Sequence, residues 1–175
     1  DGYHITVYKH DPQDPNSLPD SEINVLYKDR AGTLWIGTNG GLSQYDRDTD
    51  RFTHYKPDPD NPNSLSHKRV YSLLEDRSGM LWIGTKGGGL NQFDRKTGTF
   101  THYQSDPKNP QSLSHNNVYA ILEDRSGMLW LGTKGGGLNQ FDRETGTFTH
   151  YQPDKTNPRS LSHKNIYALL EDRLG

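Results

Sequence analysis

A short motif, Asp-Arg-x-Gly, returns along the chain at almost constant spacing, and this repetition constrains the fold more than any other feature of the sequence. Its copies begin, in order, at Asp29, Asp76, Asp124 and Asp172. The intervals between them are 47, 48 and 48 residues. Residues 68–115 and 116–163 are identical at 38 of 48 positions. The chain is therefore one structural unit copied in tandem.

Each unit contains four short segments with the composition of β-strands. In the second full copy they are residues 70–74, 80–84, 90–93 and 99–103. Turn residues separate the segments: Asp76 can accept amide hydrogens of a turn, and Gly79 tolerates a positive φ. No 3.6-residue apolar period marks a helix. We therefore predict four antiparallel strands per unit.

A sheet of four short strands cannot bury both of its faces, so neighbouring units are expected to stack face to face. Only 29% of the residues are hydrophobic, but they recur in clusters at fixed spacing, which argues against disorder. A period of about 48 residues with four strands fits a propeller blade better than a solenoid coil. Trp35, Trp82 and Trp130 occupy the same second-strand position, and we predict that they wedge between blades.

The predicted fold is all-β, with β-propeller blades of four antiparallel strands. Three blades are complete and one is partial, as in a segment of a seven- or eight-bladed ring. The complete blades are residues 21–67, 68–115 and 116–163. Residues 1–20 are predicted to hold an outer strand, at 3–8, and its connection. Residues 164–175 are predicted to hold an inner strand, at 166–170.

The pattern EDRSGMLWIGTKGGGLNQFDRKTGTFTHY, followed by DPKNPQSLSHNNVYAIL, resembles the two-component regulator propeller repeat. The resemblance covers essentially the whole chain. It implies seven-bladed propellers, often two in series, in the extracytoplasmic sensor region of bacterial hybrid histidine kinases and some diguanylate cyclases. Carbohydrates are the ligands most often proposed for that family. The resemblance therefore implies a periplasmic or extracytoplasmic location and a sensing role.

Charge and composition limit the classes of partner. The chain has 20 Lys and Arg against 22 Asp and Glu, with the two signs interleaved along the sequence. No one-sided basic region points to nucleic acid, and no apolar run is long enough to insert into a membrane. The chain has no cysteine, which excludes disulfides and thiolate chemistry. No cofactor is expected.

The loops are expected to sort onto two faces if the first strand of each blade is innermost. The loop 85–89 and the long connection 104–117 then lie together on one face, called here the long-loop face. The Asp-Arg turns lie on the other, called here the Asp-Arg face. Six of the ten differences between the two closest copies fall in the long connection. This distribution favours a functional long-loop face, and drift in exposed loops would give the same distribution.

The residues predicted to bind a ligand lie on the long-loop face. They sit at the tips of the Gly-rich loops and at the entrances to the inner strands. Three of these residues are the histidines His67, His115 and His163. To bind a metal they would have to converge, whereas equivalent atoms of adjacent blades lie roughly 10 Å or more apart. A hydrogen bond that organises the loop is predicted for them instead. The full set is Asn39, Lys86, Lys134, His67, His115, His163, Arg69, Asn117 and Asn165.

Two features resemble catalytic motifs without matching them. The Gly-rich segment at residues 84–89 lacks the spacing of a phosphate-binding loop and does not open a helix. Asp, Ser and His recur identically in every copy, whereas a catalytic constellation would distinguish one blade from the others. We therefore predict a protein that is not an enzyme, with a propeller lyase or hydrolase as the weakest alternative.

Three readings of the function follow. The first is a ligand-sensing segment for a carbohydrate or small polar ligand. The second is a structural or protein-interaction propeller. The third is the enzyme. Propellers typically close with four to eight blades, because fewer leave apolar end faces in water. We therefore also predict self-association through the terminal blades, compatible with an eight-position ring built from two chains.

Overall fold

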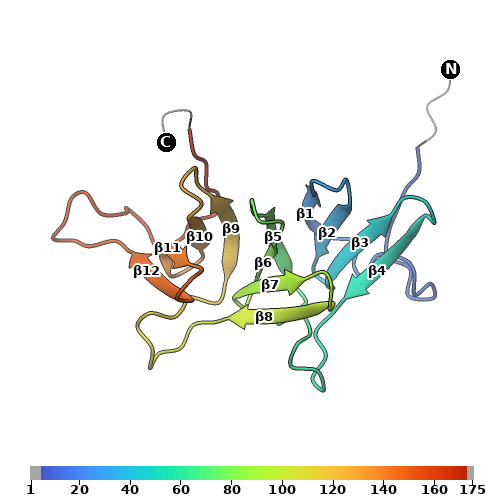
Figure 1. Cartoon of the computed structure of the whole chain (residues 1–175), viewed down its shortest axis with the longest axis horizontal. Coiled ribbons are helices and arrows are strands. Elements are labelled where there is room, and N and C mark those ends of the chain that lie inside the picture. Colours follow the sequence, from blue (N-terminus) through green and yellow to red (C-terminus); the bar gives the residue numbers. More distant parts are fainter. Residues whose placement is uncertain (1–4, 173–175) are drawn as a thin grey trace.

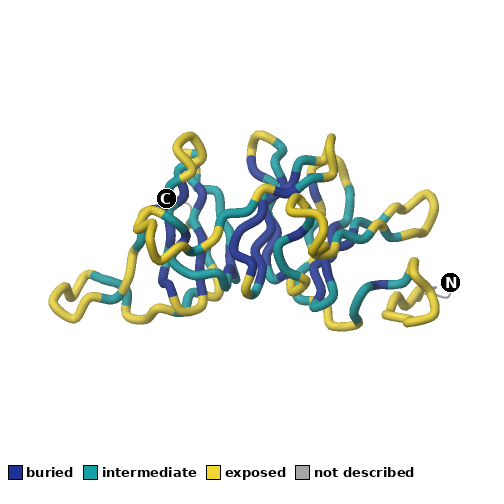
Figure 2. Tube along the Cα trace, turned by 90° about the horizontal axis from the view of Figure 1, so that it is seen from below, coloured by how far each residue is buried: buried dark blue, intermediate teal, exposed yellow. Residues whose placement is uncertain are grey.

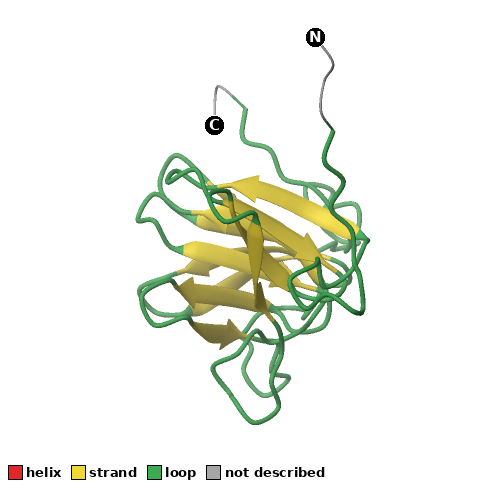
Figure 3. Ribbon diagram, turned by 90° about the vertical axis from the view of Figure 1, so that its right-hand side faces the viewer, coloured by secondary structure: helices red, strands yellow, loops and turns green. Residues whose placement is uncertain are grey.

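The computed structural model describes residues 5–172 as three separate four-stranded antiparallel sheets, ordered β1-β2-β3-β4, β5-β6-β7-β8 and β9-β10-β11-β12. Figure 1 shows the sheets fanned out as an open arc. The first strand of each sheet lies on the concave side, and the fourth strand lies outermost. Strands and loops account for all of the described residues (Figure 3). The predicted all-β blade architecture is confirmed.

The twelve strands are short and of nearly equal length. The first blade contains β1 (Ile23–Lys28), β2 (Leu34–Thr38), β3 (Leu42–Asp46) and β4 (Arg51–Tyr55). The second contains β5 (Val70–Glu75), β6 (Leu81–Thr85), β7 (Leu90–Asp94) and β8 (Thr99–Tyr103). The third contains β9 (Val118–Glu123), β10 (Leu129–Thr133), β11 (Gly137–Asp142) and β12 (Thr147–Tyr151).

The Asp of each Asp-Arg turn fixes the hairpin between the first two strands. One carboxylate oxygen of Asp76 accepts hydrogen bonds from the amides of Ser78 and Met80, at 2.9 and 3.0 Å. The other oxygen accepts one from the Trp82 indole nitrogen at 2.8 Å. The Asp side chain therefore satisfies the amides of the turn and orients the tryptophan. The sequence predicted the hydrogen bonds to the turn but not the one to the tryptophan.

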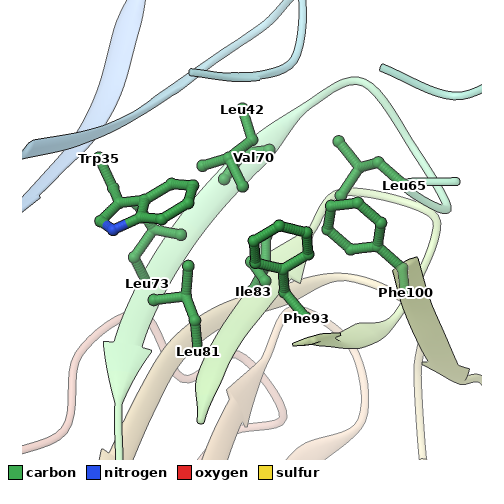
Figure 4. Close-up of a cluster of buried hydrophobic side chains, with 9 residues drawn as sticks. All are labelled: Trp35, Leu42, Leu65, Val70, Leu73, Leu81, Ile83, Phe93 and Phe100. Carbon is green, nitrogen blue, oxygen red and sulfur yellow. The ribbon is translucent and has the colours of Figure 1, made fainter. Parts of the chain in front are cut away.

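The hydrophobic core lies between blades. Figure 4 shows one cluster, in which Trp35 and Leu42 of the first blade face Val70 and Phe93 of the second. The buried segments concentrate in the strands of the stacked sheets, while the loops that project from them are exposed (Figure 2). A blade therefore completes its core only against its neighbour.

The tryptophans wedge between blades as predicted. Trp35 contacts Phe93 of the next blade edge-on, with ring centroids 5.7 Å apart. Trp82 repeats this contact with Phe141 at 5.6 Å. Because the geometry recurs almost unchanged, the aromatic contacts at the two interfaces between blades are copies of each other.

Ion pairs reinforce the same interfaces on the Asp-Arg face. Arg95 of the second blade lies 3.2 Å from the carboxylate of Asp29 in the first. Arg143 of the third lies 2.6 Å from Asp76 in the second. Both carboxylates are almost fully buried, so each arginine neutralises a charge that would otherwise be costly to bury.

The two predicted terminal strands are not formed in the described part of the chain. Residues 5–8 carry no strand, and residues 3 and 4 lie outside the described residues. Residues 166–170 also carry no strand, although Asn165 forms an isolated bridge with Lys134. A strand exists only with a hydrogen-bonded partner. In a complete blade, residues 5–8 would pair with the third strand and residues 166–170 with the second strand, and each segment lacks that partner in the described part of the chain.

Candidate functional site

The Gly-rich loops and the long connections lie together, as the arrangement of strands predicted. The Gln104 side chain donates a hydrogen bond to the carbonyl of Gly88 at 3.2 Å, which ties the start of a connection to the loop. Gly88 also lies directly against Ser66 and His67, at the end of the preceding connection. The long-loop face is therefore continuous within each blade.

The Gly-rich loop joins one blade to the next. The amides of Gly87 and Gly89 both donate to the carbonyl of Asn116 in the following blade, at 2.9 and 3.0 Å. Gly135 and Gly137 repeat this arrangement with the carbonyl of Lys164. These amides are thus engaged by the protein itself, which leaves no cradle for a phosphate.

The first blade departs from this pattern. Its loop is one residue shorter, and within the described residues it forms no such hydrogen bond to the second blade. Asn39, one of the predicted site residues, instead accepts a hydrogen bond from the Asn24 side chain of its own blade at 3.1 Å. Asn39 therefore belongs to a local contact at the edge of the first blade.

The predicted loop hydrogen bond of the histidines is confirmed. The Nδ1 atoms of His67, His115 and His163 each accept a hydrogen bond from the backbone amide two residues later, at 3.1, 3.1 and 3.0 Å. Burial lowers the pKa of His67, and the cations Arg69, Lys68 and Lys86 lower it further. His67 is therefore neutral at neutral pH and lies in a positive potential.

A second set of histidines has a structural role that the sequence did not reveal. Nε2 of His102 hydrogen-bonds the carbonyl of Ser64 at 2.7 Å, and His150 makes the same bond to Ser112. Each bond fixes the outer strand of one blade to the connection that precedes that blade. The bonded residues are 38 positions apart, so only the alignment of whole copies could have suggested the pairing.

The inner strands carry a β-bulge at the same place in every blade. The register shifts between Ile23 and Val25, between Val70 and Ser72, and between Val118 and Ala120. The residues at the three shifts are Asn24, Tyr71 and Tyr119. A bulge re-aims a side chain and is frequent beside functional sites.

The tyrosines at this position of the inner strands form a row across the blades. The ring centroids of Tyr71 and Tyr119 lie 4.7 Å apart, and those of Tyr119 and Tyr167 lie 5.5 Å apart. Burial raises the pKa of Tyr119, the neighbouring tyrosines add to this effect, and the guanidinium of Arg69 opposes it. Arg69 therefore lies within electrostatic reach of Tyr119 in the next blade.

One junction gathers most of these features. Lys86 forms an isolated bridge with Asn117 of the following blade, and its amide donates to the carbonyl of Arg69 at 2.9 Å. With the two tyrosines these residues make a group on the long-loop face at the concave end of the second and third blades. We call it the mouth cluster: Arg69, Tyr71, Lys86, Asn117 and Tyr119.

The mouth cluster contains some of the predicted site residues and adds two others. Arg69, Lys86 and Asn117 were predicted, whereas Tyr71 and Tyr119 are absent from the predicted set. Lys134 and Asn165 form the equivalent bridge at the next junction. Asn39 lies in the separate contact of the first blade. The missed signal was the replacement of tyrosine by Asn24 in the first copy.

The outer part of each long connection is a rigid scaffold. The amide of Asp58 donates to Ser64 Oγ at 2.8 Å, and Leu65 is only 1% exposed beneath it. The same hydrogen bond recurs in the later connections. Positions that differ between copies at this outer end, such as Lys108 and Arg159, are exposed. The variable positions thus divide between the mouth cluster and the outer tips.

Comparison with protein families gives a match to one family. Its model, the two component regulator propeller, matches residues 17–40, 64–87 and 112–135. Each match runs from the end of a long connection, through the inner strand, to the Gly-rich loop. No curated protein sequence matches the chain.

Solved structures share the arrangement of blades. The extracellular domain of a hybrid two component system of B. thetaiotaomicron is 30% identical, with a TM-score of 0.74. The match covers 83% of this chain and 20% of that domain. The extracellular domain of a one component system of the same organism is 28% identical, with a TM-score of 0.74, 91% of this chain covered and 20% of that one. The chain thus spans about a fifth of these relatives.

A third similar structure, more distant in sequence, is that of an enzyme. A catalytically inactive virginiamycin B lyase of Staphylococcus aureus is 20% identical, with a TM-score of 0.59. The match covers 83% of this chain and 43% of the lyase, and at this identity it shows a common fold alone.

Within residues 5–172 there is no helix that could cross a membrane, and no three His, Asp or Glu side chains are placed to hold a metal ion.

Proposed function

The chain is built from repeats of the two component regulator propeller family, and from this premise we propose that it is a non-catalytic ligand-binding segment of an extracytoplasmic sensor. Its ligand is a carbohydrate or a small polar molecule bound at the mouth cluster. The similar domains of B. thetaiotaomicron are described as extracellular parts of signalling systems. They support a sensing role and an extracytoplasmic location, and the family resemblance suggests the carbohydrate.

The observation that carries the proposal is the contact between the rings of Tyr71 and Tyr119 at the bulges of the inner strands, beside side chains that differ between copies. Residues repeated in all copies serve the common fold. Arg69 has no counterpart of its kind: the equivalent residues are Glu22, Asn117 and Asn165. Aromatic rings flanked by hydrogen-bonding side chains can stack on a sugar ring and orient its hydroxyls.

The test uses the full chain and a library of oligosaccharides and small polar metabolites, screened by thermal shift and confirmed by calorimetry. At least one compound is expected to bind. Tyr119→Asn should abolish its binding, because it removes the central ring of the row. The fold tolerates asparagine at this place, since Asn24 is equivalent in the first blade.

The matched control is Lys108→Thr, which copies Thr156 of the next connection and lies at an outer tip. It should leave binding unchanged. If Lys108→Thr removes binding and Tyr119→Asn does not, the outer tips and not the mouth cluster bind the ligand. If no compound in the library binds, the sensing proposal is wrong.

A second candidate is an interaction scaffold that associates with another copy of itself. An apolar groove of about 230 Å³ on the first blade is lined by residues that include Ile23 and Leu26, and Leu26 is 58% exposed. A groove of about 510 Å³ at the other end is lined by Trp130 and Leu170, among others, and Leu170 is 91% exposed. We call these surfaces the two end faces.

Charge complements the apolar area of the end faces. Arg47 occupies the position at which Arg95 and Arg143 pair with the preceding blade. Between described residues, Arg47 forms no ion pair and Asp124 receives no arginine. Two copies joined end to end would bring together the same kinds of groups that hold the internal interfaces.

A further inference from the structure

The cations of the long-loop face differ from those of the Asp-Arg face in how they are neutralised. All five ion pairs between described residues involve Arg30, Arg95 or Arg143, on the Asp-Arg face. Lys68, Arg69 and Lys86 of the long-loop face form none within residues 5–172. In a chain of net charge −2, three neighbouring cations without a carboxylate partner are a concentration of unneutralised charge.

The mouth cluster also combines the groups that recognise an anionic sugar. The tyrosine rings offer apolar faces, the Asn117 side chain offers an amide, and the Arg69 guanidinium can bind a carboxylate or sulfate through two parallel hydrogen bonds. His67 responds to this potential, since the neighbouring cations lower its pKa. At the position equivalent to Arg69 in the first blade the residue is Glu22. The positive charge is therefore specific to the junction between the second and third blades.

On the basis of the ligand-binding function proposed above, we propose that the mouth cluster binds an anionic oligosaccharide, whose carboxylate or sulfate groups are held by Arg69 and Lys86. The uncharged part of the sugar lies against Tyr71 and Tyr119. A single-stranded nucleic acid would need a basic groove that continues along its backbone. Here the outer tips carry Asp58 and Asp106, and the positive region ends at the junction.

The test measures the affinity of the full chain by calorimetry for four probes. These are tetragalacturonate, a chondroitin sulfate tetrasaccharide, neutral cellotetraose and octathymidylate. At least one of the two anionic sugars should bind, and more tightly than cellotetraose and octathymidylate. The carboxylate and sulfate probes distinguish the two sources of charge. Affinity should fall as salt is raised, because the contacts are charged.

Two variants locate the contact. Arg69→Asn, which copies Asn117 of the third blade, should weaken binding of the anionic sugar about tenfold or more, the effect of losing a charge-assisted hydrogen bond. Arg159→Gln, which copies Gln111 of the preceding connection, removes the same charge from an outer tip. It should change the affinity less than about twofold, as for a screened surface charge. Both exchanges introduce a residue that the repeat already accommodates.

The outcomes separate this inference from the proposed function. If cellotetraose binds as tightly as the anionic sugars and Arg69→Asn has no effect, the ligand site stands and the inference about charge is wrong. Equal losses in Arg69→Asn and Arg159→Gln would mean attraction to net charge without a site, and would also overturn it. Tighter binding of octathymidylate would replace the sugar by nucleic acid. If none of the four probes binds, the inference fails, and the wider library decides the proposed function.

Discussion

The Asp of each Asp-Arg turn is the residue on which a blade's geometry most depends. Asp124 accepts hydrogen bonds from the amides of Ser126 and Met128, at 2.9 Å each, and from the Trp130 indole at 2.7 Å. Burial alone would raise the pKa of Asp124, but these hydrogen bonds outweigh it and lower the pKa to about 2. The carboxylate thus stabilises the folded state only while it is ionised.

Asp124→Asn should lower the free energy of unfolding at pH 7 by about 2–3 kcal/mol, since each pKa unit corresponds to about 1.4 kcal/mol. The folded pKa lies below the unfolded value of about 3.9. The contribution is therefore complete above pH 5 and is lost as the pH falls towards 2. Urea unfolding at several pH values should show the difference between wild type and variant shrinking over this range.

Asp60→Asn is the control for this experiment, because Asp60 is exposed and its carboxylate accepts no hydrogen bond from another described residue. It should change stability little at any pH. A loss in Asp124→Asn that stays constant from pH 7 to pH 2 would show that the ionised carboxylate is not the source.

At the scale of the element, the Gly-rich loop requires glycine because its backbone approaches other backbone closely. Gly89 has a φ of +76°, and a Cβ atom there would lie 2.3 Å from the carbonyl oxygen of Tyr103. Gly98, in the hairpin between β7 and β8, has a φ of +71° and no atom within 4 Å of such a Cβ. The two glycines therefore share a conformation and differ in crowding.

Gly98→Ala should cost about 1 kcal/mol, the penalty of a left-handed conformation for an L-residue. Gly89→Ala should cost this penalty and about 1–3 kcal/mol more, because the added methyl group must displace backbone. Urea unfolding of both variants measures the two costs. Equal costs would mean that the close approach at Gly89 contributes nothing and that only the backbone conformation matters.

At the scale of the whole molecule, the sequence predicted whatever repetition makes visible. The period, the four strands and the position of Trp82 between blades follow from comparing copies. The bulge at Tyr71 could not be predicted, because the shift arises from pairing with β6 and leaves no mark on the composition of the strand. The pairing of His102 with Ser64 depends on where the preceding connection packs. The prediction of the terminal strands was wrong because a strand needs a hydrogen-bonded partner in space.

The position of a blade within the arc should decide how much its tryptophan contributes. Trp82 lies between two blades, with Phe141 of the next blade 5.6 Å away and its side chain 1% exposed. Trp130 donates an equivalent hydrogen bond to Asp124 but lines the open groove at the end face. Trp82→Phe and Trp130→Phe lose the same hydrogen bond, so their difference reports the contact with the following blade.

We expect Trp82→Phe to be more destabilising than Trp130→Phe by about 1 kcal/mol, the typical worth of an aromatic pair beyond its buried area. Chemical unfolding at low protein concentration, where separate copies do not cover the end faces, is the appropriate measurement. Equal losses would indicate that the tryptophan acts mainly within its own blade.

The end faces lead to the last prediction, which concerns association. Sedimentation of the chain at micromolar concentration should show a species larger than the monomer, because two apolar grooves with complementary charges are exposed at opposite ends of one molecule. Leu26→Asp and Leu170→Asp each place a carboxylate on one end face, and each should shift the distribution towards the monomer. Lys108→Asp adds a carboxylate at an outer tip and should leave the distribution unchanged. A well-folded wild-type chain that sediments strictly as a monomer would show that the end faces do not bind each other, and the ligand-binding proposal would then stand alone.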